Sequence, residues 1–209
     1  MRILIADDHA IVRSGLRHTL ELEFPDVVFG EATTGRELLE MVQAAPWDVV
    51  ILDVALGAEN GLDTLPRLKA ACPTLPVIVL SMYGERQFVL RALADGASAY
   101  LTKEQAAEEL FTAIRTVCAG RRYLGQALAG QLADHLAGDH GGKPHEALSS
   151  RELEVFLLLA QARSVSEIAE RLHLSVKTVS TYRTRILEKM SLASNAEIIQ
   201  YAVRHGLVR

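Results

Sequence analysis

The chain has 209 residues, of which 49% are hydrophobic and 23% are charged. These proportions supply enough apolar residues for hydrophobic cores in one large or two small domains, and two cysteines are too few for a disulfide framework. No apolar run approaches the ~20 residues that a membrane helix needs, and two aspartates directly follow the short apolar start, which argues against a secretion signal. We therefore expect a cytoplasmic protein.

The charge is divided unevenly along the chain. Residues 148–209 hold nine Lys/Arg and six Asp/Glu, whereas residues 1–147 hold 13 and 20. An acidic first part and a mildly basic second part suit a regulatory domain joined to an anion-binding one, although such asymmetry also arises by chance.

Five short apolar runs alternate with helical patterns in the first part of the chain. Such runs are typical of strands that are buried on both faces. They lie at Ile3–Ala6, Val27–Phe29, Val49–Leu52, Val77–Leu80 and Ala99–Leu101. The alternation predicts an α/β fold, a flavodoxin-like, doubly wound, five-stranded parallel sheet with helices on both faces.

The pattern changes after residue 122. Residues 126–136 fit a helix, and the segment GDHGGKPHE at 138–146 is typical of a flexible linker because it holds three glycines and a proline. Strand patterns then disappear, and residues 148–209 fit a small all-α domain of four helices. The expected organisation is a first domain at 1–122, a helix and flexible linker at 123–147, and a second domain at 148–209.

Polar side chains follow the predicted strands at the points where they end. Asp7 and Asp8 follow the first strand, Asp53 the third and Ser81 the fourth, and Lys103 comes two residues after the fifth. In doubly wound sheets, ligands bind outside the carboxyl ends of the strands, so these side chains should meet at one edge. Three carboxylates there would repel one another, which favours a divalent cation with oxygen ligands, namely Mg²⁺.

This group of residues indicates phosphoryl chemistry. Asp53 is the predicted nucleophile, with Lys103 and the cation neutralising the phosphoryl oxygens and Ser81 donating a hydrogen bond. Any one of these residues alone would more simply be a helix cap, but five at matching strand ends favour a site. His9 is interpreted as a loop residue rather than a metal ligand.

The segments ILIADDHAIVRSGL, VVILDVALGAENGL, VIVLSMYGERQFVLRAL and GASAYLTK closely resemble the receiver domain of NarL/FixJ-type response regulators, over residues 1 to about 120. The resemblance implies that a sensor histidine kinase phosphorylates Asp53, with Lys103 as its conserved-type lysine. It also implies a switch pair, Ser81 and Tyr100. The implied ligands of Mg²⁺, or of Mn²⁺ as a substitute, are Asp7, Asp8, Asp53 and the main-chain carbonyl of Ala55.

One segment departs from that family pattern. The family usually has Met-Pro-Gly shortly after the nucleophile, whereas this chain has Leu56-Gly57-Ala58. Loss of the proline and gain of Gly57 free the backbone φ angles, which leaves the shape of this loop and its metal affinity open.

A helix-turn-helix pattern occupies the second part. Residues 166–172 fit a short helix, Ser175 is a good N-cap, and Val176–Met190 fits a longer helix that would enter the major groove. At 100° per residue, Val179, Ile186 and Met190 share the inward face. The opposite and flanking faces carry mainly hydroxyl and basic groups, which bond bases and phosphates, although a solvated surface helix can carry them too.

The segment LSSRELEVFLLLAQARSVSEIAERLHLSVKTVSTYRTRILEKM closely resembles the LuxR-type output domain, with Gln161-Ala162-Arg163 where the family commonly has a glycine turn. The motifs KTVSTYR and YAVRHGL look most like the GacA/BvgA branch. The resemblance implies base contacts from Ser180, Thr181 and Thr184. It implies candidate DNA-backbone contacts from Lys177, Thr178, Tyr182 and Arg185.

The predicted function is that of a response regulator whose phosphorylation on Asp53 favours a homodimer that binds promoter DNA. It would not be an enzyme beyond its own phosphorylation and dephosphorylation, and would need no membrane and no small-molecule substrate besides phosphoryl donors. One alternative keeps the architecture but not the control by phosphate. An aspartate-nucleophile phosphohydrolase is less favoured because a DNA-binding pattern follows, and a regulator switched by a small molecule would need an enclosed apolar pocket instead of acids.

Overall fold

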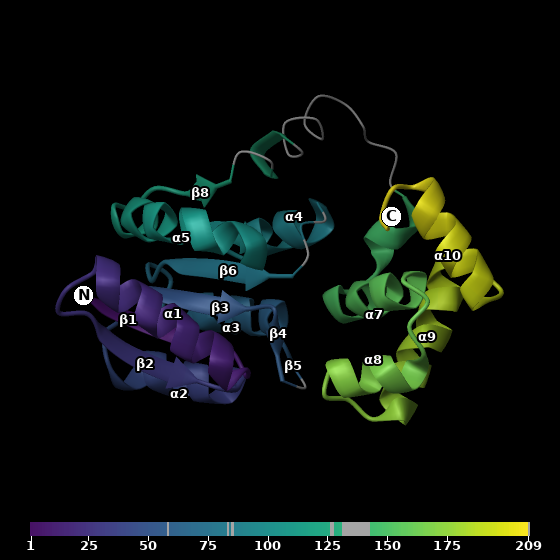
Figure 1. Ribbon diagram of the computed structural model, residues 1–209, viewed down its shortest axis with the longest axis horizontal. Helices are drawn as coiled ribbons and strands as arrows, with labels where there is room; N and C mark the ends of the chain where they lie inside the picture. Colours follow the sequence, from purple (N-terminus) through teal and green to yellow (C-terminus); the bar gives the residue numbers. More distant parts are fainter. Residues whose placement is uncertain (58, 83, 85, 126–127, 131–142, 209) are drawn as a thin grey trace. The chain divides into compact units, whose positions relative to one another are not determined.

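The computed structural model divides into two compact units, Met1–Asp139 and His140–Arg209, which are described separately. The structure describes residues 1–57, 59–82, 84, 86–125, 128–130 and 143–208. Of the helix expected at 126–136, only residues 128–130 are described, and these three are helical; most of the glycine-rich linker lies outside the described residues (Figure 1).

A parallel sheet forms the centre of the first unit (Figure 1), with the strand order β2-β1-β3-β6-β7-β8. Its strands are β1 (Arg2–Ala6), β2 (Val28–Ala32), β3 (Val49–Asp53), β6 (Val77–Ser81), β7 (Ala99–Thr102) and β8 (Tyr123–Leu124). From β1 the chain passes to β2 on one side, and from β3 it continues on the other side. The order therefore reverses between β1 and β3, and this is the position at which doubly wound sheets bind ligands.

Within the described residues, the sheet has six strands instead of the five that were expected. The five predicted strands are confirmed, and β8 is an additional short edge strand that pairs with Ala99 and Tyr100 of β7. Two residues are too few to show a strand period in the sequence. Tyr123 is also held by its side chain, because its hydroxyl donates to Glu109 Oε2 at 2.8 Å.

Helices cover both faces of the sheet, as the sequence predicts. They are α1 (Ala10–Glu23), α2 (Gly35–Ala44), α3 (Gly61–Ala71), α4 (Arg86–Ala94) and α5 (Lys103–Cys118). Leu20 of α1 and Leu110 and Ile114 of α5 form one core with Ile5 and Ile51 of the sheet, so α1 and α5 share a face. Helices α2, α3 and α4 pack beside one another on the other face. All five residues of β3 are buried, which places the end of this strand between the two helical layers.

The second unit contains the four helices expected from the sequence. They are α7 (Ser150–Ala160), α8 (Val165–Arg171), α9 (Val176–Met190) and α10 (Asn195–Arg204). Each begins after a serine whose hydroxyl accepts a main-chain N–H of the first turn, including the predicted cap Ser175 before α9. Such caps satisfy N–H groups that have no partner within the helix.

The end of the expected linker is ordered within the second unit. Residues Pro144–Ala147 form a short 3₁₀ helix, η1, and the His145 side chain is only 5% exposed. His145 Nδ1 lies 2.7 Å from the hydroxyl of Tyr201 on α10. The glycine-rich composition of the segment predicted flexibility. The contact of His145 could not be foreseen from that composition, because Tyr201 lies 56 residues further along the chain. None of the helices in the described part of the chain has the length and hydrophobicity that crossing a bilayer requires.

Candidate phosphoryl-acceptor site and nucleic-acid interface

The carboxyl edge of the sheet brings Asp53, Asp7 and Lys103 into contact. Lys103 Nζ lies 2.8 Å from Asp53 Oδ2 and 3.1 Å from Asp7 Oδ2. Both carboxylates are almost completely buried, with 2% of Asp53 and 1% of Asp7 exposed. One ammonium group thus faces two buried carboxylates, and the geometry matches the sequence-based expectation that these side chains meet.

Burial perturbs the ionisation of these groups. Loss of hydration raises the pKa of Asp53 to about 7. The positive charge of Lys103 acts to lower this pKa, and the negative charge of Asp7 acts to raise it. Burial alone would lower the pKa of Lys103, but Asp53 and Asp7 outweigh it and raise that pKa above its usual range. A second positive charge at the site would favour the ionised, nucleophilic form of Asp53.

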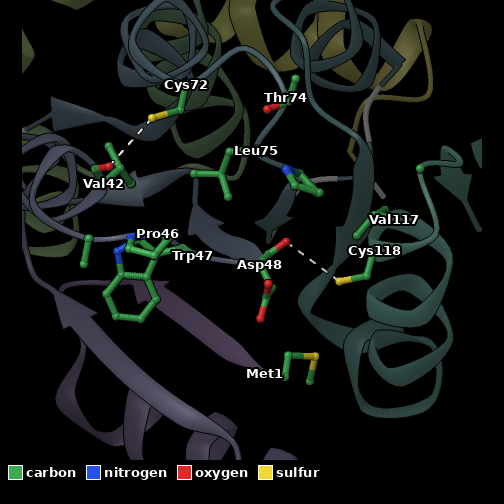
Figure 2. A pocket seen from close by; sticks show the side chains of 13 residues that line it. Met1, Val42, Pro46, Trp47, Asp48, Cys72, Thr74, Leu75, Val117 and Cys118 are labelled. Carbon is green, nitrogen blue, oxygen red and sulfur yellow. Dashed lines mark hydrogen bonds between the residues drawn. The ribbon is translucent and has the colours of Figure 1, made fainter.

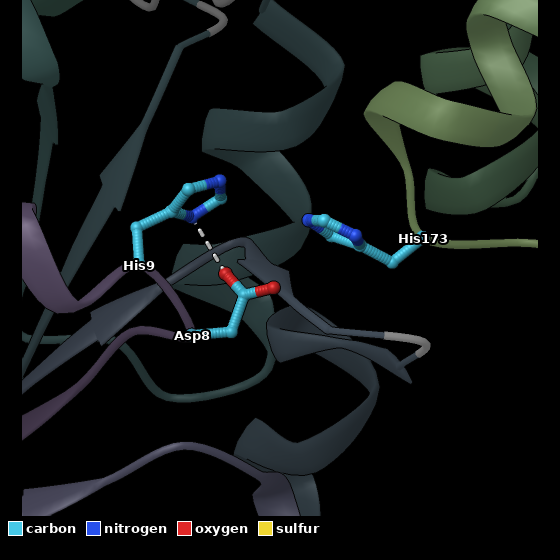
Figure 3. A group of neighbouring side chains, drawn as sticks. All are labelled: Asp8, His9 and His173. Carbon is cyan, nitrogen blue, oxygen red and sulfur yellow. Dashed lines mark ion pairs between the residues drawn. The ribbon is translucent and has the colours of Figure 1, made fainter.

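Asp8 and His9 follow Asp7 in the loop after β1, and their side chains contact each other. The Asp8 side chain is 15% exposed, and its Oδ1 lies 2.7 Å from His9 Nδ1 (Figure 3). The main-chain N–H of His9 donates to Asp7 Oδ1 at 2.7 Å. Asp7 is therefore fixed by the loop through one oxygen and by Lys103 through the other.

The donor set fits a hard divalent cation. One oxygen from each of Asp7, Asp8 and Asp53 and a nitrogen of His9 lie within 4.8 Å of one another. Carboxylate oxygens are the ligands that Mg²⁺ prefers, and three carboxylates with one ammonium leave a net negative charge for a cation to balance. The residues expected to hold Mg²⁺ thus lie together, with Ala55 two residues after Asp53 at the start of a small hairpin.

That hairpin is the shape taken by the loop that departs from the family pattern. Strand β4 (Ala55–Leu56) pairs in antiparallel fashion with β5 (Glu59–Asn60), and Gly57 adopts a left-handed φ of 62°. Glycine adopts this conformation without steric cost. Asn60 then caps α3, because its side chain accepts the N–H of Leu62 at 2.9 Å.

The two expected switch residues are both buried. Ser81 ends β6 and Tyr100 lies in β7, and each is 0% exposed. In the register, Leu80 is paired with Asp53, so Ser81 follows directly beside the end of β3. Their roles as a switch pair remain predictions.

Arg13 is a site residue that the sequence analysis did not single out. Its Nη1 donates to the main-chain carbonyl of Asp7 at 2.7 Å, and its Nε donates to Glu31 at 2.9 Å. The guanidinium therefore anchors the β1–α1 loop to the end of β2. No local pattern predicts this contact, because Glu31 lies 18 residues after Arg13.

A separate hollow of about 500 Å³ lies at the opposite, amino-terminal edge of the sheet. Both cysteines line it (Figure 2), and each thiol points to a main-chain carbonyl, Cys72 to Val42 and Cys118 to Asp48. Burial raises the pKa of the Cys118 thiol, which disfavours the reactive thiolate. The hollow is thus lined by a thiol that is less reactive than a free cysteine, and it is separate from the group of Asp7, Asp53 and Lys103.

Helix α9 has the two faces that its sequence predicts. Val179, Ile186 and Met190 are buried. The residues expected to contact DNA are exposed at Lys177, Ser180, Thr181, Thr184 and Arg185 and half-buried at Thr178 and Tyr182. Short helix α8 precedes α9 across a turn, and the two helices pack together, which is the arrangement of a helix-turn-helix.

Two details of this helix bear on recognition. The hydroxyls of Thr181 and Thr184 donate to the carbonyls of Lys177 and Ser180, at 3.0 and 3.1 Å. Thr178 instead belongs to the cap, with its hydroxyl 2.7 Å from Ser175 Oγ. The exposed threonines therefore present a methyl group and an acceptor oxygen to the surroundings.

Comparison with known proteins places both units in established families. The response regulator receiver domain matches residues 3–115, and the luxR family of bacterial regulatory proteins matches residues 146–202. The response regulator GacA of Pseudomonas aeruginosa is 38% identical over 210 aligned residues, which cover 100% of this chain and 98% of GacA.

Solved structures give the same result. RcsB of Salmonella enterica serovar Typhimurium, bound to the promoter rprA in the presence of the phosphomimetic BeF₃⁻, aligns with a TM-score of 0.62 and 27% identity over 96% of this chain and 98% of RcsB. A structure of two RcsB dimers bound to two parallel DNAs aligns with a TM-score of 0.60 and 26% identity over 97% and 98% of the chains. The chain therefore belongs to the NarL/FixJ-type response regulators, in which a receiver domain is joined to a LuxR-type DNA-binding domain.

Proposed function

We propose that Asp53 accepts a phosphoryl group from a sensor histidine kinase in the cytoplasm, and that the phosphorylated chain binds promoter DNA as a homodimer. The observation that carries this proposal is the position of Asp53, buried at the end of β3 with Lys103 Nζ 2.8 Å from its Oδ2. An Asp53 oxygen would form the new bond to phosphorus while the bond between phosphorus and the imidazole nitrogen of the kinase's phosphorylated histidine breaks, and that imidazole would leave as part of the kinase.

The other residues of the site have distinct roles in this scheme. Asp7, Asp8, Asp53 and the Ala55 carbonyl would hold Mg²⁺, which when bound balances the carboxylates and the phosphoryl oxygens. Lys103 would pass from Asp53 to the new phosphoryl group without leaving the site. Ser81 would donate a hydrogen bond to the same group, and Tyr100 would respond to that rearrangement.

The DNA-bound form is supported by α9 and by the structures of RcsB. Exposed Lys177 and Arg185 would neutralise phosphates, with Thr178 and Tyr182 beside them, whereas Ser180, Thr181 and Thr184 would face base edges. A single helix reads only a few base pairs, so two copies are needed for a specific site. The RcsB structure that contains dimers on DNA supports such an assembly.

The test is incubation of the full chain with acetyl phosphate and Mg²⁺, followed by intact mass and by DNA binding. We expect one phosphoryl group per chain, labelling that requires the cation, and a gain in DNA affinity. Asp53→Asn should abolish labelling, whereas Asp63→Asn, whose side chain is 58% exposed, should not. Full labelling of Asp53→Asn would remove Asp53 as the acceptor, and unchanged DNA binding after labelling would favour a regulator that phosphate does not control.

A further inference from the structure

His9 turns its side chain toward the acid pair instead of capping the helix that it precedes. It occupies the N-cap position of α1 but makes no side-chain cap hydrogen bond. Its Nδ1 lies 2.7 Å from Asp8 Oδ1 and 3.4 Å from Asp7 Oδ1 (Figure 3). The main-chain N–H of His9 also donates to Asp7. The backbone and the ring of this residue are therefore both tied to the metal-binding carboxylates.

The spacing of the donor atoms suits one cation. A nitrogen of His9 and one oxygen from each of Asp7, Asp8 and Asp53 lie within 4.8 Å of one another. Octahedral ligands at about 2.1 Å from a metal lie about 3.0 Å apart when adjacent and about 4.2 Å apart when opposite. The four donors are thus spaced close to the range that ligands of one ion require, and His9 lies on the exposed side of the group because 49% of its side chain is accessible.

We propose that His9 is a metal ligand at the receiver site, and that its imidazole gives the site a preference for Mn²⁺ and Co²⁺ over Mg²⁺. Mg²⁺ takes oxygen ligands and retains water, whereas imidazole is a good ligand for first-row transition metals. The inference rests on the proposed phosphoryl-acceptor function, because it concerns the cation held by the same carboxylates.

The 2.7 Å contact also has the length of a charge-assisted hydrogen bond from a protonated His9 to Asp8. The two roles predict opposite results when the ring is removed. A ligand contributes affinity, so its loss weakens the binding of transition metals. If His9 is instead a protonated imidazole that pairs with Asp8, it competes with the metal for this carboxylate, so removing the ring strengthens the binding of every divalent metal.

The direct test is pulsed electron paramagnetic resonance of the full chain loaded with Mn²⁺. We expect the modulation of a directly bonded ¹⁴N nucleus in the wild type and in the control His18→Ala, which removes an exposed histidine of α1, the helix that His9 precedes. His9→Ala should lose the modulation. Wild-type protein grown with ¹⁵N-histidine should show the ¹⁵N pattern instead, which makes the result independent of how any variant folds.

Calorimetric titration with Co²⁺ and Mg²⁺ tests the preference. His9→Ala and His9→Asn should bind Co²⁺ about tenfold more weakly than the wild type, while their Mg²⁺ affinity changes less than about threefold. Asp8→Asn should lose both metals, and its retention of normal affinity would overturn the metal site of the proposed function itself. Mn²⁺ bound through Asp8 without nitrogen modulation, or tighter binding of both metals by His9→Ala, would overturn the role of His9 alone.

Discussion

The main-chain oxygen of Asp53 occupies the space in which residue 61 would carry a side chain. A Cβ atom at Gly61 would lie 2.1 Å from that oxygen and 3.1 Å from the carbonyl carbon. The N–H of Gly61 also donates to the carbonyl of Val54 at 2.7 Å. The first residue of α3 is thus in direct contact with the backbone that carries the candidate nucleophile.

Gly61→Ala should displace that backbone. The neighbouring atoms belong to the main chain, so they cannot move aside as a flexible side chain does, and we expect a loss of about 1–3 kcal/mol in the free energy of unfolding. Labelling of Asp53 by acetyl phosphate should also slow. Urea unfolding and intact mass measure the two effects.

Gly15→Ala is the matched control. Gly15 lies within α1, and a Cβ atom there has no neighbour within 4 Å. Alanine is the better helix former by about 1 kcal/mol, so this variant should be as stable as the wild type or more stable. Equal behaviour of the two alanine variants would show that the Asp53–Gly61 contact can relax.

The raised pKa of Asp53 makes the stability of the metal-free protein depend on pH. Because the pKa rises from 3.8 to about 7 on folding, the folded state retains a proton that the unfolded state releases between these values. The free energy of unfolding should therefore fall as pH rises from about 4 to about 7 and then level off, by about 4 kcal/mol at most.

Asp53→Asn separates this effect from other titrations. Asparagine does not titrate, so the free energy of unfolding of the variant, minus that of the wild type, should increase between pH 4 and pH 7. Urea unfolding of both proteins in the presence of a chelator measures this difference. Other carboxylates with raised pKa, such as Glu154, are present in both proteins and cancel in the difference. A stability difference that stays constant with pH would contradict the assigned pKa.

Lys103→Ala should impair switching more than folding. A unit charge pair at ~4 Å is worth about 4 kcal/mol at an effective dielectric of ~20, and the phosphoryl group supplies Lys103 with its new partner only after reaction. A shift from mostly inactive to mostly active needs about 5.5 kcal/mol. We expect the phosphorylated variant to show little gain in dimerisation or DNA affinity, whereas Arg36→Ala, with an 85% exposed side chain, should switch normally. Normal switching by phosphorylated Lys103→Ala would contradict this role.

The parts of the molecule that follow from local rules were predictable from sequence. Strand ends located Asp7, Asp53 and Lys103, because the carboxyl ends of parallel strands must share an edge. The helical period located the buried face of α9. Contacts that depend on distant segments were not predictable, as shown by His145 with Tyr201 and by Gly61 with the Asp53 carbonyl.

The position of a left-handed residue in the second unit also could not be predicted from the sequence. Ala162 has a left-handed φ of 60° where the family commonly has a glycine turn. The turn is therefore kept although its residue is unfavourable there, and composition alone does not show which residue adopts such a conformation.

Thr181 and Thr184 of α9 should recognise bases through their hydroxyl oxygens, which act as hydrogen-bond acceptors. Their hydroxyl hydrogens are directed to the carbonyls of Lys177 and Ser180, which leaves oxygen lone pairs for the amino groups of adenine or cytosine. Thr181→Val and Thr184→Val keep the shape but lose the acceptor, so each should change the preferred base at one position by about 1–3 kcal/mol. Thr→Ser at either position should keep the wild-type preference. Binding-site selection with phosphorylated protein measures this.

Lys177→Ala and Arg185→Ala should act differently, because both positions lie where phosphates are expected. Each variant should weaken binding to all sequences alike and reduce the slope of log affinity against log salt by about one unit. Arg36→Ala removes the same charge from the first unit and should change neither quantity. Selection at two salt concentrations separates these effects. The opposite result would be an unchanged base preference in both valine variants and an altered preference in Lys177→Ala or Arg185→Ala. It would mean that α9 is rotated differently in the groove, with its basic residues toward the bases and its threonines toward the DNA backbone.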